Sequence, residues 1–144
     1  MIIRHYQCED LEPFTELMAD LGYPTDANTM RKRLEKIHSN SMYNTFVAEW
    51  NDGKIVGMVG VRQLISYETD ELVTQISALV TKKEYRNKGI GKALVKHVEE
   101  WALANHSNMI YLTSGNREDR LQAHAFYRSL GFEMTGLRFV KRLK

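Results

Sequence analysis

The stretch of residues 72–112 constrains the fold of this chain more than any other part of the sequence. Residues 72–81 contain an apolar run, residues 89–105 carry apolar side chains at helical spacing, and residues 109–112 form a second short apolar run. A strand, a crossover helix and a second strand in this order make a parallel pair within one sheet. The sequence therefore predicts an α/β or α+β fold with a mixed sheet.

The rest of the chain predicts further strands and helices around that unit. An Asp52-Gly53 turn favours a β-hairpin, because glycine adopts positive φ at low cost. A helix capped by Thr25 or Asp26 is expected in the N-terminal third. The predicted strands cover residues 1–6, 43–50, 54–64, 72–81, 109–112 and 132–143, and the predicted helices cover residues 9–21, a segment after residue 26, 89–105 and 119–130. The predicted element order is β-α-α-β-β-β-α-β-α-β.

Composition limits the class of protein. The chain has 144 residues, with 43% hydrophobic and 26% charged residues, and no linker-like stretch, so residues 1–144 are expected to form one domain. A formal charge of +2 is too balanced for a protein that coats nucleic acid. The single Cys8 excludes a disulfide framework and a cysteine-rich metal cluster, and it suits a reducing compartment. Without an apolar run of membrane-spanning length, we expect a cytoplasmic protein with no membrane partner.

A glycine-containing loop between the strand at 72–81 and the helix at 89–105 predicts an anion site. Gly89 and Gly91 let the backbone approach a ligand closely. The first amides of a helix are unpaired donors at its positive end, which favours phosphate. The surrounding segment is basic, with Lys82, Lys83, Arg86, Lys88, Lys92 and Lys96 against Glu84.

Neither common nucleotide loop fits this sequence. A Walker motif needs glycine and Ser or Thr where this chain has Arg86 and Ala93, and a dinucleotide fingerprint needs a third glycine where it has Leu94. Nucleic-acid binding through the basic segment is the weaker alternative, because the lysines surround a phosphate-sized loop and do not form a long stripe. No metal is expected, since His97 and His124 lack ligand spacing to other candidate donors.

A second motif on the next helix changes the interpretation. Ala123 and Tyr127 lie one helical turn apart on one face. The pattern Arg-x-x-Gly-x-Gly at 86–91, followed by Ala-x-x-Phe-Tyr-x-x-x-Gly-Phe at 123–132, closely resembles the GNAT superfamily of acetyl-coenzyme A-dependent N-acetyltransferases. The resemblance covers nearly the whole chain. Within the superfamily, the sequence is similar to a bacterial subgroup of small, single-domain members.

The resemblance implies a GNAT fold and transfer of an acetyl group from acetyl-coenzyme A to a primary amine, by direct attack in a ternary complex. Backbone groups of Leu79, Val80 and Thr81 would pair with the pantetheine arm of the donor, and the Val80 amide would face the thioester oxygen. Backbone amides along the loop would hold the pyrophosphate. The loop residues carried over in this way are Arg86, Asn87, Lys88, Gly89, Ile90, Gly91 and Lys92.

The same resemblance assigns the opposite wall of the cleft. Asn116, Ala123 and Phe126 would contact the donor, and the small Ala123 would leave room for it. Tyr127 matches the tyrosine that donates a proton to the departing thiolate. An ordinary tyrosine, with a pKa of about 10, is protonated at neutral pH and can serve as that acid.

Two positions depart from the family pattern. Ser77 stands where many relatives have glutamate, and Arg120 stands where many have asparagine. The proton of the acceptor amine would then pass to ordered water or to a carboxylate from elsewhere in the chain. The candidate carboxylates are Glu49 and an acidic cluster formed by Glu68, Asp70 and Glu71. A coenzyme A-binding regulatory module without transfer is the alternative function. The last predicted strand, at 132–143, is a basic edge and a candidate homodimer contact.

Overall fold

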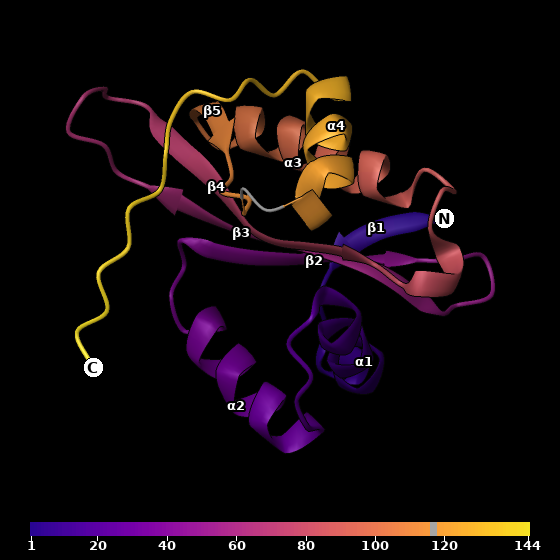
Figure 1. Cartoon of the computed structure of the whole chain (residues 1–144). Coiled ribbons are helices and arrows are strands. Elements are labelled where there is room, and N and C mark those ends of the chain that lie inside the picture. The colour runs from indigo at the N-terminus through magenta and orange to yellow at the C-terminus, as the bar shows by residue number, and fades with distance from the viewer. Residues whose placement is uncertain (116–117) are drawn as a thin grey trace.

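A mixed five-stranded sheet forms the centre of the molecule (Figure 1). The computed structural model describes residues 1–115 and 118–144. The strand order is β1-β2-β3-β4-β5, in which β1 to β4 are successively antiparallel and β5 is parallel to β4. The strands are β1 (Ile2–His5), β2 (Tyr43–Glu49), β3 (Ile55–Leu64), β4 (Leu72–Thr81) and β5 (Ser107–Tyr111). The predicted mixed sheet and its parallel pair are confirmed.

Two pairs of helices cover the two faces of the sheet. Figure 1 shows α1 and α2 on one face and α3 and α4 on the other. The helices are α1 (Leu11–Leu21), α2 (Ala27–His38), α3 (Ile90–Ala104) and α4 (Leu121–Ser129). Short 3-10 turns, Cys8–Asp10, Lys83–Tyr85 and Glu118–Arg120, precede α1, α3 and α4.

The apolar core is divided between these two faces because successive strand side chains point to opposite sides. Phe46 and Val59 join the α3 side, whereas the neighbouring Val47 and Met58 join the α1 side. The α3 side is completed by Ile90, Leu94, Val95 and Val98, and the α1 side by Phe14, Leu17, Met30 and Leu34. Both clusters therefore hold the central strands rigidly beneath the loop that follows β4.

The turns and caps follow from particular residues. The Asp26 side chain accepts a hydrogen bond from the Thr29 amide at 2.8 Å, so Asp26 is the residue that caps α2. Gly53 has φ 86° in the turn between β2 and β3, as the hairpin prediction requires. Among the described residues, no helix is long and apolar enough to cross a lipid bilayer.

The predicted last strand, at 132–143, is wrong. Within residues 132–144, all of which the structure describes, no residue lies in a strand, and residues 133–144 are exposed. After α4 the chain runs past the sheet and away from it (Figure 1). This segment has no positive φ, so it contains none of the two-residue hairpin turns that require one. The strand at 109–112 is also shifted, since β5 begins at Ser107.

Candidate functional site

The parallel pair of β4 and β5 opens into a wedge halfway along β4. The last paired residues are Gln75 and Tyr111, and β4 then continues to Thr81 without a partner on that side among the described residues. Residues 76–81 therefore present a row of backbone donors and acceptors at an open edge. An extended ligand can pair with such an edge as an added strand does.

A β-bulge marks the point where the wedge begins. Gly60 pairs with Ala78 and Val61 pairs with Ile76, so Ser77 has no partner on β3. Bulges bend a strand and redirect its side chains, and they often lie beside functional sites. Ser77 is exposed there, and its hydroxyl brings no carboxylate to the wedge.

Hydrogen bonding on the β3 side decides which amides face the open edge. The Lys82 amide donates to the Val56 carbonyl at 2.7 Å, so Lys82 faces β3. Backbone groups alternate along a strand, and Val80, two residues earlier, therefore faces β3 as well. The amides of Leu79 and Thr81 face the wedge. By this geometry the Leu79 amide, and not the Val80 amide expected from the resemblance, lies on the side of the wedge.

The loop after β4 leaves a series of backbone amides free at the start of α3. Ala93 is the first residue whose amide bonds back along this turn, to the Gly89 carbonyl at 3.0 Å. The amides of residues 87–92 donate to no described residue, whereas the Arg86 amide donates to the Lys83 carbonyl. Asn87 and Gly89 have φ of 65° and 80°, which bends the loop over the helix end. This cradle of donors at a helix N-terminus suits a phosphate group.

Phe126 of α4 brings the second motif to this loop. Its Cζ atom lies 3.2 Å from the position that a Cβ atom would take at Gly91, and the Thr81 hydroxyl oxygen lies 3.7 Å from the same position. The end of β4, the start of α3 and the middle of α4 therefore meet at Gly91. Ala123 is partly buried on α4, one turn before Tyr127.

Tyr127 is half-buried between two aromatic rings. Its ring centroid lies 5.5 Å from that of Phe126 and 5.9 Å from that of Phe132. Burial raises the pKa of the Tyr127 hydroxyl, and the Arg120 guanidinium opposes part of that rise. The side chain is therefore a protonated donor at neutral pH. Asn116, the other residue expected on this wall, lies outside the described residues.

Arg120 is a site residue that the family pattern does not supply. It precedes α4 and lies about two helical turns before Tyr127, hence on the same side of the helix. Its Nη2 atom donates to the Ser114 hydroxyl oxygen at 3.4 Å. The seven-residue spacing in the sequence was the signal that could have placed it beside Tyr127.

The carboxylates considered as bases lie elsewhere. Glu49 accepts a hydrogen bond from Arg4 at 3.2 Å and is part of an ion-pair network. The acidic cluster precedes Leu72 at the far end of β4. Seven residues of strand separate Leu72 from Leu79, or roughly 23 Å at a rise of about 3.3 Å per residue.

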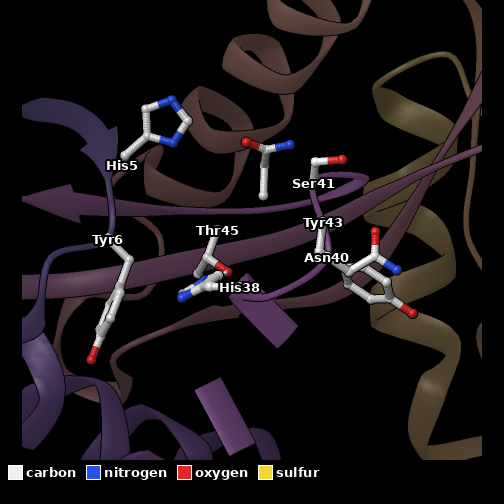
Figure 2. A pocket seen from close by; sticks show the side chains of 8 residues that line it. His5, Tyr6, His38, Asn40, Ser41, Tyr43 and Thr45 are labelled. Atoms are coloured by element: carbon white, nitrogen blue, oxygen red, sulfur yellow. Dashed lines mark hydrogen bonds between the residues drawn. The ribbon is translucent and has the colours of Figure 1, made fainter. Parts of the chain in front are cut away.

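A separate hollow lies at the opposite end of the sheet (Figure 2). His5 and Tyr6 line one side of it, and Tyr43 and the segment before it line the other. His38 shares a hydrogen bond of 2.9 Å with the Thr45 hydroxyl, and burial lowers its pKa. The start of β2 pairs with the end of β3, so this hollow is remote from the loop after β4.

Residues 3–132 match the Acetyltransferase (GNAT) family, and this match spans both motifs and the wedge. The chain belongs to that family. Its structure resembles a crystal structure of a GNAT family acetyltransferase from Staphylococcus aureus, with a TM-score of 0.86 and 32% identity over 99% of this chain and 98% of that one. The GNAT fold expected from the motifs is thereby confirmed.

Curated proteins with similar sequences include N-acetyltransferases. The chain is 38% identical over 86 residues to N-acetylaspartate synthetase of Xenopus tropicalis. These aligned residues cover 60% of this chain and 30% of that protein. It is 30% identical over 126 residues to the uncharacterized N-acetyltransferase YhdJ of Bacillus subtilis, covering 87% and 86% of the two chains. The chain thus spans less than a third of the first relative and most of the second.

Proposed function

We propose that residues 1–144 act as one N-acetyltransferase domain, which transfers the acetyl group of acetyl-coenzyme A to a primary amine. The observation that carries this proposal is the continuity between the open edge of β4 and the free amides of residues 87–92. A pantetheine arm needs an extended partner, and the pyrophosphate next to it needs converging donors. The open edge of β4 offers the first, and the free amides that follow it along the chain offer the second.

Different residues around the wedge bind different parts of acetyl-coenzyme A. Backbone groups of Leu79 and Thr81 pair with the pantetheine arm, and the amides of residues 87–92 donate hydrogen bonds to the pyrophosphate. Cationic side chains of the loop, including Arg86 and Lys88, attract the nucleotide phosphates. Ala123 and Phe126 supply the wall on α4.

The transfer is a displacement at the thioester carbon. The amine nitrogen forms a bond to that carbon, and the Leu79 amide stabilises the negative charge that develops on the oxygen. The carbon–sulfur bond then breaks, and Tyr127 gives its proton to the sulfur. The proton lost by the amine passes to ordered water, because Ser77 cannot take it and the carboxylates considered lie elsewhere. Solvent later restores the proton of Tyr127.

A thiol-release screen tests the transfer. The wild-type chain is incubated with acetyl-coenzyme A and a panel of polyamines, amino acids, aminoglycosides and peptide amines, while free thiol and acetylated amine are measured together. Amine-dependent thiol release with matching product is expected. Thiol release that no amine accelerates would argue against the proposal.

The exposed Ser77 at the bulge supports a second candidate function, a coenzyme A-binding module without transfer. Both candidates bind coenzyme A, but only the enzyme makes acetylated amine in the screen. For either one, the single exposed thiol of Cys8 supports a reducing compartment such as the cytoplasm as the place of action.

A further inference from the structure

Arg62 is a half-buried cation on the middle strand of the sheet, β3. Its Nε atom donates to the Gln75 side-chain oxygen on β4 at 2.5 Å. Among the described residues, its guanidinium forms no ion pair, whereas that of Arg4 meets both Asp10 and Glu49. An ion pair within the described chain therefore does not explain why this charge is held on the sheet.

Arg62 and Gln75 together present hydrogen-bond donors without acceptors. A guanidinium only donates, so the Gln75 oxygen faces it, and the Gln75 amide nitrogen remains free. The two Nη atoms of Arg62 also donate to no described residue. No buried side-chain nitrogen or oxygen of the described residues lacks a partner, so these free nitrogens are open to a ligand. A guanidinium fork with free ends matches the oxygens of a carboxylate or a phosphate.

These donors lie where the wedge between β4 and β5 begins. Gln75 and Tyr111 are the last paired residues of the two strands, and the bulge residue Ser77 follows two positions later, at roughly 7 Å by strand rise. In the proposed complex the pantetheine arm runs along residues 76–81, with its pyrophosphate at the α3 end. The acetyl group at the other end of the arm then comes close to Ser77. A molecule whose amine attacks there lies within reach of Arg62.

Arg62 also lies on the face of the sheet that leaves room for an acceptor. Val61 joins the α3 cluster, so the next side chain along the strand, that of Arg62, points to the face covered by α1 and α2. The loop proposed to bind the donor and Tyr127 belong to α3 and α4, which cover the other face (Figure 1). An acceptor held by Arg62 therefore approaches the thioester from the side opposite the proton donor.

We propose that Arg62 binds an anionic group of the acceptor, so that the preferred substrate is an amine that also carries a carboxylate or a phosphate. This inference rests on the proposed transfer. The Arg62 fork binds two oxygens of the anion, and Gln75 fixes the guanidinium and adds a further donor. The distance between Gln75 and the bulge requires several bonds between the amine and the anion. A diamine would instead bring a second cation to Arg62 and be repelled.

A series of acceptors tests this preference. β-Alanine, γ-aminobutyrate and δ-aminovalerate are compared with their primary amides, with diamines and with aminoalkyl phosphates of the same lengths. The wild-type chain should have a kcat/KM about tenfold or more higher for the acids or the phosphates than for the amides, with an optimum at one length. The larger of the two increases identifies the anionic group. Equal values for acids, phosphates and amides, or higher values for diamines, overturn the proposal.

Variants at position 62 assign the preference to this side chain. Arg62→Gln should lower kcat/KM for the best anionic acceptor about tenfold to a hundredfold, mainly through KM, and change that for the matched amide less than about twofold. Arg62→Lys keeps the charge without the fork and should lose less. The exposed Arg142→Gln is the matched control, and circular dichroism checks that every variant folds. An equal loss for acid and amide in Arg62→Gln would mean a structural role and overturns the assignment.

A binding measurement separates this inference from the transfer itself. The N-acetylated form of each acid and its primary amide are titrated by calorimetry into wild type and Arg62→Gln, with coenzyme A present. Binding of one acid that is tighter than that of its amide, in wild type and not in Arg62→Gln, is expected. That result together with no acetylation of any amine would overturn only the transfer. Equal binding of every acid and its amide by wild type, or no binding of either, overturns the anion site.

Discussion

The ring of Phe126 lies against Gly91, with its Cζ atom 3.2 Å from the position of a Cβ atom on that residue. Gly91 lies in the first turn of α3, and Phe126 lies in the middle of α4. This contact holds the helix that carries Tyr127 against the amides proposed to bind the donor. The donor loop and the proton donor are therefore mechanically connected, and a change in one should be felt by the other.

The first prediction concerns that contact. Gly91→Ala should raise the KM for acetyl-coenzyme A about fivefold, since relieving a tight contact by moving Phe126 costs about 1 kcal/mol. Adding Phe126→Leu to Gly91→Ala should restore much of the affinity, because a smaller side chain removes the clash. Steady-state kinetics of the single and double variants check this. An unchanged KM in Gly91→Ala would disconnect α4 from donor binding.

Gly89→Ala provides a comparison with a different physical cause. No atom lies within 4 Å of a Cβ atom at Gly89, but its φ of 80° disfavours any side chain. We expect a loss of about 1 kcal/mol in the free energy of unfolding, measured in urea, from backbone strain alone. Phe126→Leu should not rescue it.

The second prediction concerns Tyr127. Removing the proton donor in Tyr127→Phe should lower kcat about 100-fold and leave the KM for acetyl-coenzyme A nearly unchanged. Because burial raises the Tyr127 pKa above the ordinary tyrosine value, the acid stays protonated and should cause no loss of wild-type kcat up to about pH 10. The exposed Tyr23→Phe is the control. Equal kcat for Tyr127→Phe and wild type would remove the acid role.

The sequence predicted most of the fold because local signals and long-range packing agree. Residues 72–81 are rich in apolar and β-branched side chains and form β4 as expected, and Gly89 and Asn105 flank the observed α3. The failure at 132–143 has a physical reason. That segment contains enough apolar residues to suggest a strand, but a strand also requires a partner edge, and local sequence does not show whether one is available.

The residues of the candidate site stay predictions: the loop glycines come from their place between a strand and a helix, and Phe126 comes from the family resemblance. The sequence did not predict how the backbone amides of the site are oriented. The choice between Val80 and Leu79 depends on which edge an amide faces, and that is fixed by the Lys82 bond to β3 and by the bulge at Ser77. Such register information comes from pairing between strands that are distant in sequence.

The third prediction concerns the ion pair between Arg4 and Asp10. Asp10 is 5% exposed, and its carboxylate accepts bonds from Arg4 at 2.8 and 2.9 Å and from the Gln7 amide at 2.8 Å. Asp10→Asn should lower the free energy of unfolding by about 2 kcal/mol at pH 7, since it removes the buried charge that pairs with Arg4 and leaves Arg4 only Glu49, at 3.2 Å. Urea titrations measure this, with the exposed Glu12→Gln as control.

The pH dependence of that difference has a definite sign. Burial tends to raise the Asp10 pKa, but the Arg4 and Gln7 bonds together outweigh it and hold that pKa below its usual range, so the ionised carboxylate stabilises the folded state at neutral pH. That stabilisation is fully present above the pKa that Asp10 has in the unfolded chain, about 3.9. It is lost as pH falls through the lower pKa that Asp10 has in the folded protein. The gap between wild type and Asp10→Asn should therefore close only below about pH 4. A gap that is constant to pH 2 would contradict the assignment.

The fourth prediction concerns the cations of the loop. Arg86→Ala and Lys88→Ala should each raise the KM for acetyl-coenzyme A about threefold to tenfold at low salt, and less at 0.5 M salt, because these exposed charges act through screened attraction. Acetyl-pantetheine lacks the nucleotide phosphates, so its KM should not change. Lys32→Ala on α2 serves as the control. An equal effect on both donors would mean that the charges act on the fold and not on the phosphates.

The last prediction follows from the position of Ser77 at the bulge. A carboxylate there would lie at the mouth of the wedge and could take the amine proton directly, in place of ordered water. Ser77→Glu should therefore raise kcat/KM for the best amine of the screen several-fold near pH 7, whereas Ser77→Gln, with the same shape and no base, should not. The increase should vanish below about pH 4, where a glutamate becomes protonated. Equal rates for the two variants at neutral pH would show that proton removal does not limit the transfer or that Ser77 does not face the amine.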